Sequence, residues 1–205
     1  MLNVSRVHQY YVFFILILLL IITRGHHFTR VDQLPGASWA VFFLAGIYLQ
    51  PKWMPLALLG CVFGLDILPL VFNDGHLAIT FNRETAYCLT PAYFFLFPAY
   101  GALWLSGHWY ASRHSFQWQT LIPLSTAFLV GAVMCELISS GSFYFFSGYF
   151  DEPTLVEFAS RVLRYFPPYL QSMLFYLTVA IFLHVLTVFS IQGSSAFANS
   201  GRHPQ

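Results

Sequence analysis

A lone cysteine at the start of a predicted helix is the residue with the clearest chemical potential in this sequence. Cys88 lies in the segment Thr-Ala-Tyr-Cys-Leu-Thr-Pro-Ala-Tyr, which runs from Thr85 to Tyr93. If Thr85 caps the helix, Cys88 is its third residue, where unpaired backbone amides and the helix dipole favour the thiolate. A thiolate is a soft metal ligand or a nucleophile, whereas a buried thiol packs as a small hydrophobic group. Both interpretations of Cys88 stay open at this point.

The other cysteines and a late histidine favour structural roles. Cys61 and Cys135 lie within apolar stretches without a helix-start position, and no CxxC spacing occurs. The sequence therefore predicts neither a disulfide framework nor a site for a free metal ion. His184, alone in the last apolar stretch, is expected to hydrogen-bond a neighbouring helix.

Two carboxylates occur inside apolar segments. Asp66 lies in Gly-Leu-Asp-Ile-Leu-Pro, and Glu136 is followed by Ser139 and Ser140. A charge at the centre of a membrane costs about 3 kcal/mol on insertion scales, so a paired or functional role is expected for each. For Asp66 the alternatives are a binding role, a structural ion pair and a protonated acid. For Glu136 the nearby serines favour structural hydrogen bonding.

Basic side chains near predicted helix ends add to this set. His26 and His27 follow Arg24 and are either interfacial anchors or, for one of them, a group that reaches into a cavity. Arg161 belongs to Val156–Tyr165, whose pattern predicts a short amphipathic surface helix. Arg161 is then either a solvated charge or part of a lid over a cavity.

The composition identifies the class of protein. The chain has 205 residues, of which 58% are hydrophobic and 8% are charged. A soluble domain carries about 25% charged residues, so we predict an all-α integral membrane protein. The net charge of +1 and the lack of a basic cluster give no argument for nucleic-acid binding. Residues 1–191 form one predicted domain, and the Gly-, Ser- and Asn-containing tail 192–205 is expected to be disordered.

Apolar runs bounded by polar residues, proline or glycine predict six membrane-spanning helices. Their ranges are Val7–Thr23, Ser38–Gln50, Met54–Phe72, Ala86–Ser106, Thr120–Phe146 and Tyr169–Ile191. Gly60 and Gly64 in the third range form a small-residue motif that permits close helix packing. Six spans place both chain ends on one side of the membrane, and each loop is then assigned to a face.

This assignment of loops to faces places the polar residues in and beside the apolar segments at one end of the predicted bundle. The two faces carry nearly equal numbers of Lys and Arg, so charge alone does not orient the chain. One face, however, mixes basic with acidic residues and receives the ends of the segments that hold His27, Asp66, Cys88, Glu136 and Arg161. We therefore predict a single polar site at that face.

Together these residues resemble the BtuM family of solitary vitamin B12 transporters, which is related to the substrate-binding S-components of ECF transporters. The resemblance rests on the six-span plan, the step Arg24-Gly25-His26-His27, the intramembrane Asp66 and the helix start Ala86-Tyr87-Cys88-x-x-Pro91-Ala92-Tyr93. Arg161 lies in the last loop, where that family keeps an arginine. The resemblance covers the whole chain, and its specific part is the cysteine helix with Asp66 and Arg161.

The resemblance implies a six-helix bundle in the bacterial inner membrane, with cytoplasmic termini and an outward-facing cavity for cobalamin, the transported ligand. Cys88 would be the lower axial ligand of cobalt, which suits a soft, strongly donating thiolate. Its donation weakens the upper cobalt–carbon bond, so decyanation of cyanocobalamin, with Cys88 as the catalytic residue, is an expected side reaction. His27, Asp66, Tyr93 and Arg161 would contact the corrin amides or the displaced nucleotide loop.

One segment departs from the ECF pattern, and two other function classes stay open. S-components commonly carry Ala-x-x-x-Ala in the first span, whereas Tyr11–Ile22 contains neither alanine nor glycine. This difference argues against docking on an ECF coupling module and agrees with a solitary role. The alternatives are a membrane thiol or redox enzyme with Cys88 as nucleophile, although the motif holds no partner cysteine or base, and a scaffold subunit of a membrane complex.

Overall fold

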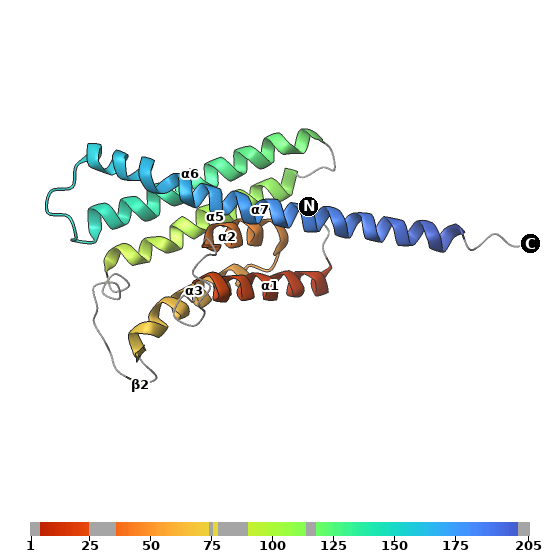
Figure 1. The fold of residues 1–205 in the computed structure, drawn as a ribbon, viewed down its shortest axis with the longest axis horizontal. Coiled ribbons are helices and arrows are strands. Elements are labelled where there is room, and N and C mark those ends of the chain that lie inside the picture. Colours follow the sequence, from red (N-terminus) through yellow and green to blue (C-terminus); the bar gives the residue numbers. More distant parts are fainter. Residues whose placement is uncertain (1–4, 25–35, 74–75, 78–89, 114–117, 201–205) are drawn as a thin grey trace, which may run out of the picture.

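Helices make up most of the computed structural model, which describes residues 5–24, 36–73, 76–77, 90–113 and 118–200 (Figure 1). The α-helices are α1 (Arg6–Arg24), α2 (Ser38–Tyr48), α3 (Trp53–Val71), α5 (Leu96–Arg113), α6 (Leu121–Phe146) and α7 (Leu155–Ser200). Two 3-10 helices, η2 (Pro91–Phe95) and η3 (Trp118–Thr120), precede α5 and α6. In the described residues the only strands are β1 (Phe72–Asn73) and β2 (His76–Leu77), which pair antiparallel.

The length and composition of the helices suit a membrane. Three helices of the described chain are long and apolar enough to cross one: α1, α6 and the part Leu155–Thr187 of α7. The helix α2 and the part Trp53–Leu68 of α3 are also apolar but shorter. The fold is thus that of an all-α membrane protein, as its composition predicts.

The short helix α2 lies at the centre of the bundle. Every residue from Ser38 to Ile47 is buried, and α2 contacts α1, α3, α5, α6 and α7. Its sequence is apolar on all sides, so it must be surrounded by other helices. The hydroxyl of Tyr48 at its end lies 3.4 Å from Nδ1 of His184 on α7, which confirms the helix-to-helix bond expected for this histidine.

Glycines allow α2 and α5 to approach each other closely. A Cβ atom at Gly46 on α2 would collide with the backbone oxygen of Trp104, and one at Gly107 on α5 would collide with the backbone oxygen of Phe43. Each helix therefore places a glycine against the backbone of the other. Even the smallest side chain would separate them at this crossing.

Gly60 and Gly64, whose spacing permits close helix packing, lie against no other helix in the described part of the chain. Both glycines are exposed on α3, and no described atom lies within 4 Å of a Cβ built at either position. A small-residue motif marks a surface that permits close packing, but it does not specify which helix packs there.

The predicted fourth span, Ala86–Ser106, is not one continuous helix. Thr90 is extended, with φ −79° and ψ 149°, and η2 and α5 begin after it. Pro91 explains the break, because its ring disfavours helical backbone in the preceding residue. Residues 86–89, which include Cys88, and the proposed cap Thr85 lie outside the described residues.

The predicted surface helix Val156–Tyr165 and the predicted last span are joined in one helix of 46 residues, α7. Pro167 and Pro168 lie inside it, a position that membrane helices tolerate when neighbouring groups satisfy the freed backbone. Its last turns include residues 192–200 of the segment predicted as a disordered tail, since extending an existing helix costs little. The C-terminal part of α7 projects beyond the other helices (Figure 1).

Candidate functional site

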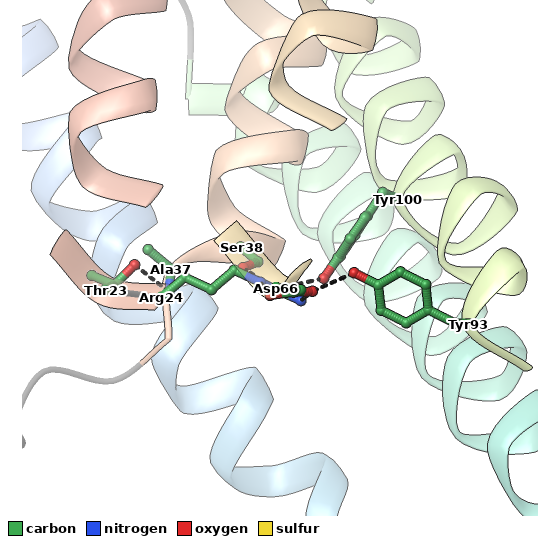
Figure 2. Close-up of polar contacts among 7 residues, drawn as sticks. All are labelled: Thr23, Arg24, Ala37, Ser38, Asp66, Tyr93 and Tyr100. Carbon is green, nitrogen blue, oxygen red and sulfur yellow. Dashed lines mark hydrogen bonds and ion pairs between the residues drawn. The ribbon is translucent and has the colours of Figure 1, made fainter. Parts of the chain in front are cut away.

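A bidentate ion pair joins α1 to α3. Nε and Nη2 of Arg24, the last residue of α1, each donate a hydrogen bond of 2.6 Å to a carboxylate oxygen of Asp66 (Figure 2). The two side chains are 24% and 15% exposed. This geometry is the strong form of a carboxylate–guanidinium interaction. Of the alternatives for Asp66, the structure supports the ion pair.

Three further side chains complete the group that we name the Arg24 cluster: Arg24, Ser38, Asp66, Tyr93 and Tyr100. Nη1 of Arg24 donates to the hydroxyls of Ser38, at 2.9 Å, and Tyr100, at 3.0 Å. The hydroxyl of Tyr93 donates to Oδ2 of Asp66 at 2.5 Å. The cluster therefore connects α1, α2, α3, η2 and α5 (Figure 2).

Aromatic packing holds the two tyrosines in place. The turn that begins at Pro91 brings Tyr93 into the core, where its ring meets the edge of Phe63 at 4.9 Å between centroids. Tyr100 stacks on Phe42 of α2 at 4.4 Å. Both tyrosines are buried, so their hydroxyls need the polar partners that the cluster provides.

A cavity of about 510 Å³ lies beside the Arg24 cluster, between α1, α2, α5, α6 and α7. Its lining consists of Thr23, Arg24, Gly36, Ser38, Trp39, Leu96, Tyr100, Glu136, Ser139, Ser140, Phe143 and Tyr169. Aromatic walls with a few polar groups are typical of sites for small molecules. The cluster contributes three of the lining residues, so the ion pair and the cavity form one site.

Glu136 of α6 is the carboxylate of this cavity. The residue is only 2% exposed, and Ser140 donates a hydrogen bond of 2.7 Å to its Oε1. This is the structural hydrogen bond that the sequence predicted from the nearby serines. The side chain also lines the cavity, next to the Arg24 cluster.

Asp66 and Tyr93 are the predicted binding residues that the structure brings together. Both belong to the Arg24 cluster. Cys88 and His27, like His26, lie outside the described residues, and their proposed roles stay predictions. Arg161 is described and contacts neither Asp66 nor the cavity among the described residues.

Arg161 lies in a separate contact near the start of α7. Its Nε and Nη2 donate to Oε1 of Glu157, both at 3.0 Å, and its guanidinium lies 4.4 Å from the ring centroid of Phe150. The hydroxyl of Tyr144 on α6 donates to Oε2 of Glu157 and accepts from the backbone N–H of Thr154, both at 3.0 Å. These bonds attach the first turns of α7 to the end of α6.

The Tyr144 hydroxyl is expected to stabilise the attachment of α7 to α6. Changing Tyr144→Phe removes both hydroxyl bonds and should weaken the attachment by about 2 kcal/mol, because each typical hydrogen bond has a net worth of about 1 kcal/mol. Limited proteolysis should then cut residues 147–154 faster than in the unaltered protein. Tyr11→Phe, on an exposed tyrosine of α1, is the control. Equal cleavage rates in all three proteins would refute the attachment.

Arg24, Ser38 and Tyr100 are site residues that the sequence did not single out as such. Two signals were available. An intramembrane Asp66 needs a partner, and Arg24 lies at the same predicted face. Tyr100 follows Tyr93 by seven positions, which is two helical turns and hence the same side of a helix. No comparable signal exists for Ser38.

Neither a search for metal-binding groups nor comparisons with known proteins assign a function to this site. Within the part of the chain that the structure describes, no three His, Cys, Asp or Glu side chains are grouped so that they could hold a metal ion. A scan against protein-family models gives no match for the chain. A search of the curated proteins likewise finds no match.

Proposed function

We propose that this chain is a membrane uptake protein for cobalamin or a related corrinoid, with the Cys88 thiolate as the axial cobalt ligand. In this proposal the six described α-helices belong to six membrane spans, arranged as in an S-component, with cytoplasmic termini in a bacterial inner membrane. The resemblance to the BtuM family suggests the ligand. The observation that supports the proposal is the cavity of about 510 Å³ beside the Arg24 cluster.

The chemistry of the cavity suits part of a large polar ligand. Buried ionisable groups are costly in a membrane, so Arg24, Asp66 and Glu136 in and beside one cavity are more than is needed to pack helices. Cobalamin is larger than the cavity. The cavity would therefore hold one edge of the corrin ring, with the carboxamide side chains that surround it.

The position of Tyr93 supports a role for Cys88 at this site. Tyr93 is fixed to Asp66 by its hydroxyl bond, and η2 begins at Pro91, three positions after Cys88 in the sequence. Three residues of chain span at most about 11 Å. The proposal therefore requires Cys88 to lie on the same side of the bundle as the Arg24 cluster.

The proposed thiolate would allow cyanide to leave cyanocobalamin without a reductant. Sulfur donates to cobalt from below and weakens the upper cobalt–carbon bond. That bond then breaks heterolytically, so cyanide leaves with both electrons and cobalt stays in its trivalent state with sulfur bound. The reaction would be a consequence of binding rather than the main activity.

Visible absorption tests the proposal directly. Protein expressed with cyanocobalamin should purify with bound corrin, and its absorption bands should be shifted from those of the free vitamin. Cys88→Ser should lose the shift, because a hydroxyl is a much weaker ligand for cobalt than a thiolate. Cys61→Ser, on a half-buried cysteine of α3, should keep the shift.

The outcomes separate the function classes. Colourless unaltered protein would refute cobalamin uptake and leave the thiol enzyme and the scaffold as the alternatives. Bound corrin with the same spectrum in Cys88→Ser would retain uptake but refute thiolate ligation. Continued decyanation by Cys88→Ser would refute the proposed route of cyanide loss.

A further inference from the structure

Arg24 and Glu136, the two charged residues in the cavity lining, differ in how many hydrogen bonds they can still form. Arg24 donates four hydrogen bonds within the Arg24 cluster, to Asp66, Ser38 and Tyr100. Within the described residues this leaves one guanidinium N–H group without an acceptor. The positive charge is also already balanced by Asp66. Arg24 therefore has little capacity left to bind an anionic ligand.

Glu136 has the opposite property. A carboxylate offers roughly four lone-pair sites, and Ser140 occupies one of them. Oε2 of Glu136 has no hydrogen-bond partner among the described residues. Among these residues, Trp104 Nε1 is the single side-chain nitrogen or oxygen that is both fully enclosed and without a partner. Oε2 is therefore not fully enclosed. Since Glu136 is 2% exposed and lines the cavity, its open side faces the cavity.

The groups around Glu136 preserve this preference. The other ionisable side chains of the cavity lining are Arg24 from α1, Tyr100 from α5 and Tyr169 from α7, and Cys135 precedes Glu136 on α6. Among these described groups, Arg24 is the one cation, and it is paired with Asp66. An anionic ligand group would find no available counterion among these groups, whereas a neutral N–H donor would meet an acceptor oxygen of Glu136.

We infer that Glu136 is a specificity-determining residue that accepts a hydrogen bond from a carboxamide N–H group of the bound corrinoid. This inference rests on the proposed function and extends it by naming the ligand group that the cavity recognises. The site selects the neutral carboxamide and rejects a carboxylate at the same position of the corrin rim. Glu136 belongs to neither the cysteine segment nor the set of binding residues that the sequence predicts.

Matched corrinoids test the inference. The probes are cyanocobalamin and its monocarboxylic acids, in each of which one carboxamide is hydrolysed to a carboxylate. Binding to the full-length protein in detergent is measured by equilibrium titration near neutral pH. At least one acid isomer should bind about ten-fold more weakly than cyanocobalamin, the effect of losing one hydrogen bond to a charged group.

Substitutions then assign the discrimination to Glu136. Glu136→Gln should bind cyanocobalamin about ten-fold more weakly and should distinguish it from the sensitive acid isomer by less than about three-fold. Glu136→Asp keeps the charge and should keep the preference for the carboxamide at lower affinity. Glu152→Gln, on an exposed carboxylate of the α6–α7 connection, should behave as the unaltered protein.

Each outcome supports or overturns the inference. Equal affinity of the unaltered protein for cyanocobalamin and all its acid isomers would overturn it, whether or not Glu136→Gln folds. Retained discrimination in folded Glu136→Gln would overturn it as well. In both cases cyanocobalamin binding, and with it the proposed function, would stand. Failure of the unaltered protein to bind cyanocobalamin would overturn both proposals together.

Discussion

Changing Arg24→Met is expected to lower the free energy of unfolding by about 3 kcal/mol, because it leaves Asp66 as a largely buried charge without its counterion. The substitution also removes the donor of the bonds to Ser38 and Tyr100. Methionine keeps much of the side-chain volume, so the effect reports the lost charge rather than a cavity. Thermal unfolding in detergent, followed by tryptophan fluorescence, measures the change.

A double substitution distinguishes a buried-charge effect from simple loss of packing. In Arg24→Met/Asp66→Leu no charge is left behind, and an apolar replacement of a buried pair is often neutral. We therefore expect the double variant to recover at least half of the stability lost in Arg24→Met. Arg113→Met, on an exposed arginine that contacts Trp109, is the control and should cost less than about 1 kcal/mol. Equal losses in Arg24→Met and Arg113→Met would contradict the prediction.

Changing Gly46→Ala or Gly107→Ala is expected to cost about 3 kcal/mol, at the upper end of the range for overpacking. Each new methyl group would collide with a backbone oxygen of the facing helix, and backbone cannot move aside as a flexible side chain can. The yield of monodisperse protein and its thermal midpoint should both fall.

The matched controls are Gly60→Ala and Gly64→Ala on α3. Both positions face open space among the described residues, so the added methyl meets nothing there. Helix propensity then favours alanine by as much as about 1 kcal/mol. If all four substitutions changed stability alike, the close approach of α2 and α5 would not be the cause.

The apolar runs predict most helix ends because burying a charged or strongly polar side chain in a membrane is costly. The predicted Val7–Thr23 and Met54–Phe72 differ from α1 and α3 by a single residue at each end. Proline is harder to interpret. Pro91 interrupts a predicted helix, whereas Pro167 and Pro168 lie inside α7. The local restriction is similar, but the outcome depends on whether tertiary contacts favour a break.

The partners within the site could be predicted only in part. An intramembrane aspartate requires compensation, and the face assignment brings Arg24 to the same end, but it cannot select one basic residue among several. The roles of the glycines could likewise be predicted only in part. Gly60 and Gly64 have the recognisable spacing, whereas Gly46 and Gly107 are a single glycine on each of two helices and become significant only where those helices cross.

The continuous helix α7 has a mechanical consequence. Its 46 residues extend over about 69 Å, roughly twice the hydrocarbon thickness of a bilayer. Tyr169 at the cavity and Ser200 at the helix end are about 46 Å apart along this rod. A tilt of about 5° around the cavity would therefore displace the distal end by roughly 4 Å. A small tilt of the helix near Tyr169 would thus become a larger displacement at its distal end.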